Sequence, residues 1–316
     1  MSVDLSKLDA ANKAIQSDKN AAKTTKAYAQ AATDVLHAMN PTPTPPSPPP
    51  PPPGGIRWGI SSNIAGWPSR EEPRMVALGA KLTREDTAGA FAWCQSNGVS
   101  PFQIIDVGGT AAADSRAYGF NAGGNEPYWN GVNPPTYFPA VLADVKALKA
   151  KFPGIPVSCS VVSRGLPGSG NGGSFDANGN YTYGGVTKPW TSWIHDLAPE
   201  LLTLVDAWEA HPYFDHTFKA LSTVRNQLTG YGVAQPFWCT EIGMYLCTSG
   251  GEVGTKTPGQ QATDFQTIIT NLGARTDVTA VVFYRLSENT EGTEQWGVLD
   301  ANGNQLPAWS IVKAVM

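Results

Sequence analysis

Short apolar runs alternate with amphipathic stretches from Ile56 to Met316, which is the pattern of βα units in a parallel sheet. Eight of the apolar runs have the length and composition of strands. Between them, Tyr137–Lys151 and Pro258–Asn271 have the pattern of helices, and Thr257-Pro258 is a typical helix start. The eight expected strands are Arg57–Ser61, Ala80–Arg84, Phe102–Val107, Tyr118–Gly123, Val157–Val162, Ala207–His211, Phe237–Thr240 and Ala280–Tyr284.

Eight βα units over residues 56–316 match a (β/α)8 TIM barrel, for which about 250 residues are typical. An open doubly wound sheet is the alternative, but the Gly-x-Gly-x-x-Gly turn after its first strand is missing. The long segment Gly165–Lys188 is rich in Gly, Ser and Asn and follows the fifth expected strand. We therefore expect it at the carboxyl-terminal face of the barrel, which is the catalytic side of this fold.

The first 40 residues have a different pattern. They are rich in Ala and Lys and contain no Gly or Pro, so we predict one long helix over 1–40. Apolar residues recur at a spacing of three and four, including Leu8, Ile15 and Leu36, which favours a coiled-coil or docking surface. A solvated helix of marginal stability is the alternative.

Residues 41–55 are dominated by proline. Such a run adopts the polyproline II conformation at about 3.1 Å per residue, which predicts a stiff spacer of roughly 40 Å. The predicted domains are therefore an N-terminal helix over 1–40, a proline-rich linker over 41–55 and a barrel over 56–316.

The charge, the lengths of the apolar runs and the spacing of the cysteines argue against several classes of partner. The net charge of -4 gives no electrostatic reason to expect nucleic acid or an anionic membrane as a partner. No run approaches the roughly 18 apolar residues of a membrane span, and the N-terminus lacks the pattern of a secretory signal. The four cysteines lack zinc-site spacing, so no metal or cofactor is expected; Cys239 and Cys247 form a disulfide across a loop or remain buried thiols.

Two carboxylates directly follow apolar runs, in Asn125-Glu126-Pro127 and in Thr240-Glu241-Ile242-Gly243. Two carboxylates that face each other across a cleft are what acid-assisted cleavage of a glycosidic bond requires. In this interpretation Glu126 is the general acid and base, and Glu241 is the nucleophile. The alternatives are that Glu126 belongs to an ordinary turn and that Glu241 forms a salt bridge at the barrel mouth.

In these motifs, and in their order along the chain, residues 56–316 resemble the clan A glycoside hydrolases. These are retaining (β/α)8 barrels with the acid/base after strand four and the nucleophile after strand seven. The resemblance implies that Arg84 supports Glu241 and that Asn125 binds a sugar hydroxyl. The motifs that carry it are Leu78–Arg84, Asn125-Glu126-Pro127, Asp206–Tyr213, Glu241, Trp296–Asp300 and Pro307-Ala308.

Further side chains are candidates for the site. Tyr213 and His211 are candidates for binding substrate, and either could orient the nucleophile. For His211 a role as a buried structural histidine is equally expected. Glu209 shares strand parity with His211, so we expect it inside the barrel as a structural polar partner. The flat side chains expected to bind sugar are Trp129, Trp296 and Tyr284.

A helix, a proline rod and a hydrolase head also resemble a bacteriophage minor tail protein, particularly of phages that infect actinobacteria. That resemblance implies a place in the virion, action outside the cell, and a host-envelope polysaccharide as substrate. It implies that the helix binds other tail subunits or further copies of itself. The alternatives are a non-catalytic carbohydrate-binding or structural tail protein and a secreted microbial glycosidase.

Overall fold

The computed structural model describes residues 55–62, 68–85, 88–127, 131–163, 180–213, 217–244, 246–247, 256–287, 294–300 and 302–316. The predicted helix over 1–40 and nearly all of the linker over 41–55 lie outside these residues, so both stay predictions.

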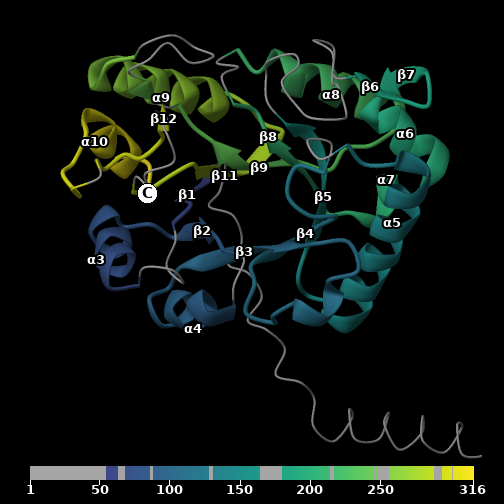
Figure 1. The fold of residues 1–316 in the computed structure, drawn as a ribbon, viewed down its shortest axis with the longest axis horizontal. Coiled ribbons are helices and arrows are strands. Elements are labelled where there is room, and N and C mark those ends of the chain that lie inside the picture. Colours follow the sequence, from purple (N-terminus) through teal and green to yellow (C-terminus); the bar gives the residue numbers. More distant parts are fainter. Residues whose placement is uncertain are drawn as a thin grey trace, which may run out of the picture. The chain divides into compact units, whose positions relative to one another are not determined.

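The barrel prediction is confirmed. Eight strands form one parallel sheet in the order β1-β11-β9-β8-β5-β4-β3-β2, so that sequence neighbours are mostly spatial neighbours (Figure 1). Each of the eight expected strands corresponds to one of them. Their bounds are β1 (Arg57–Ile60), β2 (Leu82–Arg84), β3 (Ser100–Ile105), β4 (Gly119–Ala122), β5 (Val157–Ser163), β8 (Ala207–His211), β9 (Phe237–Ile242) and β11 (Val278–Phe283).

The barrel closes between β1 and β2 without a ladder of backbone hydrogen bonds in the described strands. The hydroxyl of Thr83 on β2 donates instead to the carbonyl of Ile60 on β1, at 2.9 Å. Gly59 permits this close approach, because a β-carbon there would lie 2.2 Å from the carbonyl oxygen of Leu82. Side-chain contact thus replaces backbone pairing at this junction.

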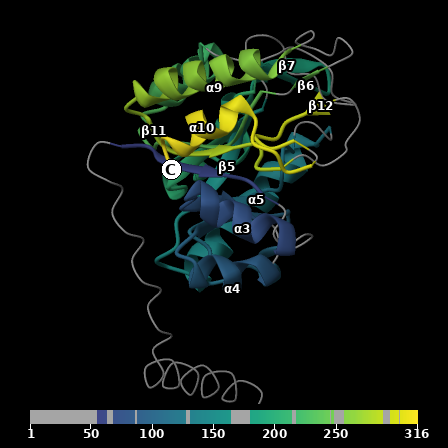
Figure 2. The same ribbon diagram turned by 90° about the vertical axis from the view of Figure 1, so that its left-hand side faces the viewer.

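Helices surround the strands on the outside (Figures 1 and 2). The two expected helices are α5 and α9, and α9 begins with a capping box between Thr257 and Gln260. None of the described helices is both long and apolar enough to cross a bilayer. The α-helices are α3 (Pro68–Leu78), α4 (Ala88–Ser96), α5 (Pro134–Lys151), α6 (Trp190–Leu197), α7 (Leu201–Leu204), α8 (Lys219–Gly230), α9 (Pro258–Gly273) and α10 (Pro307–Lys313).

Five smaller elements were not predicted. The end of the expected loop Gly165–Lys188 forms a hairpin of β6 (Asn180–Tyr183) and β7 (Val186–Pro189), joined by Gly184 and Gly185 at positive φ. A second short pair joins β10 (Leu246–Cys247) to β12 (Glu294–Gln295), and η1 (Thr110–Ala112) is a single 3-10 turn after β3.

The barrel interior changes from apolar to polar along the strands. Phe102, Ala207 and Trp238 belong to one buried apolar cluster, and the Trp238 ring lies where a side chain at Gly119 would be. Two residues further along β8, the interior side chain is Glu209, and two further it is His211; both are fully buried. The strand alternation therefore places a polar layer at the carboxyl ends, above an apolar base.

Candidate active site

A β-bulge directs Glu241 into the barrel. Cys239 pairs with Val281 and Ile242 pairs with Phe283, so β9 has one more residue than β11 between these pairs. The additional residue allows Thr240 and Glu241, which are neighbours in sequence, both to be buried and to bond to interior side chains.

Glu241 is held by two groups from other strands. One of its oxygens forms an ion pair with the Arg84 guanidinium at the end of β2. Its other oxygen accepts a hydrogen bond from the hydroxyl of Tyr213, just after β8. The structure thus brings together three predicted site residues, and both partners favour the charged carboxylate of Glu241.

The turn after β4 presents Glu126. Gly123, Gly124 and Glu126 have φ values of 101°, 82° and 46°, so three of four successive residues are in the left-handed region. A β-carbon at Gly123 would lie 2.4 Å from the hydroxyl oxygen of Tyr137, and that hydroxyl donates to the Gly123 carbonyl at 3.0 Å. Positive φ is costly for a residue other than glycine, and such strain is concentrated at functional sites.

His211 connects Glu126 to a buried carboxylate. Its Nδ1 lies 2.9 Å from Glu126 Oε1, and its Nε2 lies 2.5 Å from Glu209 Oε1. Glu209 is completely buried, as we expected from strand parity, and it accepts further hydrogen bonds from Ser160 and Thr240. His211 therefore has a carboxylate at each ring nitrogen.

The charges in this group reinforce one another. Burial raises the pKa of Glu209, but the charge and hydrogen bond of His211, with Arg84 and Ser160, outweigh burial and hold that pKa at about 2. Burial lowers the pKa of His211, but Glu209 and Glu126 outweigh it, so the net pKa is raised above its ordinary value of 6.5. His211 is thus stabilised as an imidazolium and Glu209 as a carboxylate.

The two catalytic candidates lie close together. One oxygen of Glu126, one oxygen of Glu241 and a nitrogen of His211 are all within 4.8 Å of one another. Retaining glycosidases have carboxyl groups about 5 Å apart, whereas inverting enzymes leave room for a water between them. The same atoms fit a metal ion poorly, because Arg84 already compensates Glu241 and both nitrogens of His211 face carboxylates.

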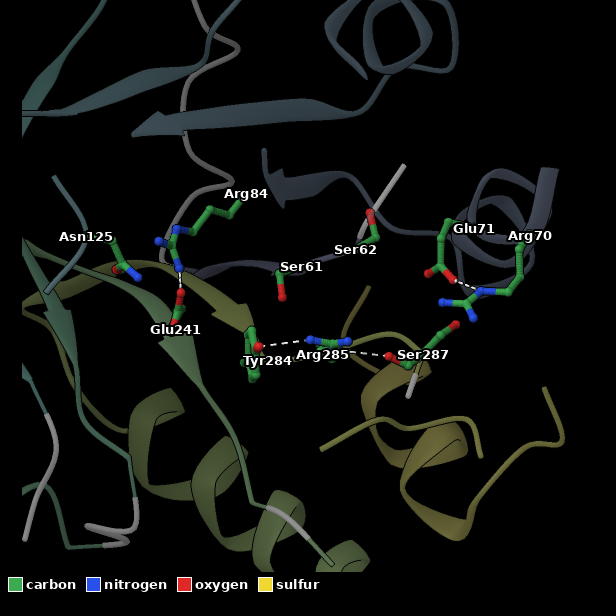
Figure 3. A pocket seen from close by; sticks show the side chains of 10 residues that line it. All are labelled: Ser61, Ser62, Arg70, Glu71, Arg84, Asn125, Glu241, Tyr284, Arg285 and Ser287. Atoms are coloured by element: carbon green, nitrogen blue, oxygen red, sulfur yellow. Dashed lines mark hydrogen bonds and ion pairs between the residues drawn. The ribbon is translucent and has the colours of Figure 1, made fainter. Parts of the chain in front are cut away.

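A pocket of about 240 Å³ opens beside Glu241 (Figure 3). Asn125, which is exposed, lies at one end with Arg84, and Tyr284 follows along the wall. The lining residues are Ser61, Ser62, Arg70, Glu71, Arg84, Asn125, Glu241, Tyr284, Arg285 and Ser287.

Trp296 lies beside this pocket. Its ring packs edge-on against Tyr213, with centroids 5.2 Å apart, and against Tyr284, at 5.7 Å. The other tryptophan expected to bind sugar, Trp129, lies outside the described residues. Cys239 is a buried free thiol and so does not bridge to Cys247.

The sequence did not point to several members of the site. Ser160 and Thr240 join Glu209 in one hydrogen-bonded group, and strand parity could have placed Ser160 inside the barrel. Thr240 and Glu241 could not both be placed inside by parity, because only the bulge permits it. No sequence motif indicated a role for Arg285.

Comparison with known proteins identifies the fold. A scan against protein-family models finds no match, and neither does a search of curated proteins. Among solved structures, a family 39 glycoside hydrolase from Bacteroides cellulosilyticus WH2 matches with a TM-score of 0.59 at 12% identity, over 83% of this chain and 64% of that one. A GH2 β-galacturonidase from Eisenbergiella tayi matches with a TM-score of 0.55 at 10% identity, over 83% of this chain and 51% of that one.

Xylanase 10B from Thermotoga petrophila RKU-1 matches with a TM-score of 0.55 at 11% identity, over 83% of this chain and 94% of that one. The chain thus spans between half and two thirds of the first two enzymes, and nearly all of the xylanase. These three structural neighbours are glycoside hydrolases, and at such identities the likeness establishes a shared barrel fold.

Proposed function

We propose that the barrel is a retaining glycoside hydrolase in which Glu126 is the acid/base and Glu241 is the nucleophile. The observation that carries this proposal is the approach of the two carboxylates to within 4.8 Å, beside a pocket that Glu241 lines. Their separation favours direct attack by a carboxylate over attack by an intervening water. The fold shared with glycoside hydrolases supports it independently.

The first step forms a covalent glycosyl-enzyme. A carboxylate oxygen of Glu241 attacks the anomeric carbon as the bond to the leaving oxygen breaks, and protonated Glu126 gives its proton to that oxygen. Arg84 and Tyr213 hold Glu241 ionised and aimed during this step. Asn125, at the rim of the same pocket, binds a sugar hydroxyl.

The second step releases the sugar. Glu126, now ionised, takes a proton from a water whose oxygen attacks the anomeric carbon, and the bond to Glu241 breaks. This returns the proton to Glu126 and the charge to Glu241. The hydrogen bond from His211 fixes the rotation of the Glu126 carboxyl group, and its positive charge favours the ionised form that this step requires.

We infer a polysaccharide as substrate. Xylanase 10B is described in complex with xylobiose and the β-galacturonidase with bound galacturonate, which supports a carbohydrate but not a particular sugar. The predicted helix, rod and head architecture leads us to propose a minor tail protein of a phage, which acts outside the cell on a host-envelope polysaccharide. This assignment rests on the sequence of residues 1–55.

Replacing each carboxylate tests the enzymatic proposal. Glu126→Gln and Glu241→Gln should each lower the release of reducing ends from host-wall glycans by about a thousandfold or more. With azide added, Glu126→Ala should give a glycosyl azide of retained configuration, and Glu241→Ala one of inverted configuration. Equal product from the wild type and both variants would show that the carboxylates are not catalytic.

The second candidate is a non-catalytic carbohydrate-binding tail protein. The observation in its favour is that both carboxylates have ionic partners, Arg84 and His211, which a purely structural network would also show. In that case Glu126→Gln and Glu241→Gln would leave glycan binding intact, and neither the wild type nor the variants would release reducing ends.

A further inference from the structure

The pocket continues from Glu241 along the ends of β11 and β1, past Tyr284 to Arg285 (Figure 3). Glu126 is not among the residues that line it. In a retaining hydrolase the acid/base faces the leaving group, so a pocket that extends away from it receives the sugar whose anomeric carbon is attacked. The wall around Arg285 therefore faces this sugar, the glycone.

Arg285 is a fixed cation in this wall. Its Nε donates to the carbonyl of Ser287 at 2.9 Å, and its Nη1 donates to the hydroxyl of Tyr284 at 2.9 Å. Nη2 has no hydrogen-bond partner within the described part of the chain, and no described carboxylate pairs with the guanidinium. Two bonds thus orient the guanidinium in the pocket wall.

The carboxylates of Glu71 and Glu85 lie near this end of the pocket, and both already have partners. Oε1 of Glu85 accepts a hydrogen bond from the Ser62 hydroxyl at 2.9 Å. Glu71 is 1% exposed, and its Oε1 lies 2.6 Å from Arg70 Nε and 3.6 Å from Arg74 Nη1. Neither of these carboxylates pairs with Arg285 in the described part of the chain. A cation partly withdrawn from water without a counter-charge favours binding of an anion.

A buried hydroxyl provides a second, independent donor. Ser61 is 7% exposed, and its Oγ has no hydrogen-bond partner in the described structure although it lines the pocket. Its backbone is fixed, since its N–H donates to Phe283 and its carbonyl accepts from Leu286. Figure 3 shows the Ser61 side chain pointing toward Tyr284 and Arg285. A buried polar group without a partner is costly unless a ligand satisfies it.

We propose that the glycone is an acidic sugar, a uronic acid, whose carboxylate accepts hydrogen bonds from Arg285 Nη2 and Ser61 Oγ. A guanidinium combined with a hydroxyl donor matches the acceptor-only oxygens of a carboxylate. The choice of the glycone rests on the proposed function, whereas the anionic subsite rests on the pocket alone.

Binding of acidic polymers and of their carboxyl-reduced forms tests this subsite without relying on turnover. We would measure binding of full-length Glu126→Gln protein to polygalacturonate, glucuronoxylan and hyaluronan, and to the same polymers after reduction of their carboxyl groups, in 0.15 M salt to screen nonspecific attraction. At least one acidic polymer should bind ten times tighter or more than its reduced form. Adding Arg285→Gln should remove that preference and leave binding of the reduced form within about twofold.

Three further variants separate recognition from folding. Arg285→Lys should keep part of the preference because it keeps the charge, and Ser61→Ala should weaken acidic binding several-fold without lowering the melting temperature. Lys146→Gln removes one charge from an exposed pair with Glu200 and should change nothing. A preference that is absent, that survives Arg285→Gln, or that falls equally in Lys146→Gln overturns the subsite.

A separate measurement of hydrolysis by the wild type distinguishes failure of the subsite from failure of the hydrolase proposal. Cleavage of neutral and acidic polymers with equal efficiency would refute the subsite and leave the hydrolase proposal standing. A preference for acidic polymers that depends on Arg285, without cleavage of any polymer, would refute the hydrolase proposal and leave the subsite standing.

Discussion

At the scale of single residues, His211 links a buried charged residue of the barrel interior to a residue of the proposed active site. Its two ring nitrogens contact Glu126, which we assign to the chemistry, and Glu209, which is fully buried beneath it. A buried charge that loses its partner costs about 3–5 kcal/mol, so each member of this chain depends on the next. The orientation of Glu126 is thus determined from inside the barrel.

This group predicts a pH dependence of stability. The pKa of Glu209 is lowered from 4.5 to about 2, so its contribution is present above pH 4.5 and is lost as the pH falls toward 2. The pKa of His211 is raised above 6.5, so its contribution is present below pH 6.5 and is lost as the pH rises through the folded-state pKa. The pair should therefore stabilise the protein most between pH 4.5 and 6.5.

Urea unfolding from pH 3 to 8 measures this effect as the difference between the wild type and the double variant Glu209→Gln/His211→Asn. We expect the difference to fall on both sides of the plateau, by about 2 kcal/mol on the acid side at pH 3. A difference that is constant with pH would show that these two groups do not titrate as assigned.

At the scale of elements, two local irregularities aim the carboxylates. The bulge in β9 turns Glu241 inward, and the turn after β4 with its successive positive φ values presents Glu126. Both departures from regular structure occur at the carboxyl ends of strands, where a barrel can change its loops without disturbing its core.

Gly123→Ala should impair catalysis through the turn. The new β-carbon would lie 2.4 Å from the Tyr137 hydroxyl oxygen, at a φ of 101°. We expect kcat on the substrate polysaccharide to fall about a hundredfold and the free energy of unfolding to fall by about 1–3 kcal/mol. Gly154→Ala is the matched control, because a β-carbon there meets nothing within 4 Å; equal losses in both variants would contradict this account.

Thr257→Ala should affect stability alone. It removes the capping box of α9, in which Thr257 Oγ1 accepts from the backbone N–H of Gln260. The expected loss is about 1 kcal/mol, measured by thermal melting, with kcat at 25 °C unchanged. Thr263→Ala, an exposed site on the same helix whose hydroxyl bonds to the Gly259 carbonyl, should be nearly neutral. A Thr257→Ala variant as stable as Thr263→Ala would show that the cap is not needed.

The sequence predicted the regular parts better than these irregular ones. The eight strands follow from apolar runs and α9 from Thr257-Pro258, because both patterns are local. Strand parity correctly placed Glu209 inside. The bulge at Thr240–Glu241 depends on pairing with β11, and the role of Arg285 depends on a pocket formed by distant segments, so neither could be read from neighbouring residues.

At the scale of the whole molecule, we predict that the helix expected over 1–40 determines the oligomeric state. Its apolar stripe has nothing to pack against within one helix, so we expect the full chain to self-associate and residues 56–316 to be monomeric. Light scattering after size-exclusion chromatography measures both masses. Ile15→Lys with Leu36→Lys in the full chain should restore the monomer, and a full chain that is monomeric from the start would contradict the coiled-coil prediction.

The closure between β1 and β2 has a consequence for the whole cylinder. Every other neighbouring pair of barrel strands is joined by a backbone ladder in the described structure, whereas this pair is fastened by the Thr83 hydroxyl. Separation of β1 from β2 breaks no backbone ladder, so local opening of the barrel should begin at this junction, and its amides should exchange hydrogen fastest. Arg84 stands at the end of the same edge and holds Glu241. Local separation of β1 from β2 would therefore weaken the ion pair between Arg84 and Glu241, the proposed nucleophile, before any helix unfolds. The stability of this strand junction would then control the reactivity of Glu241.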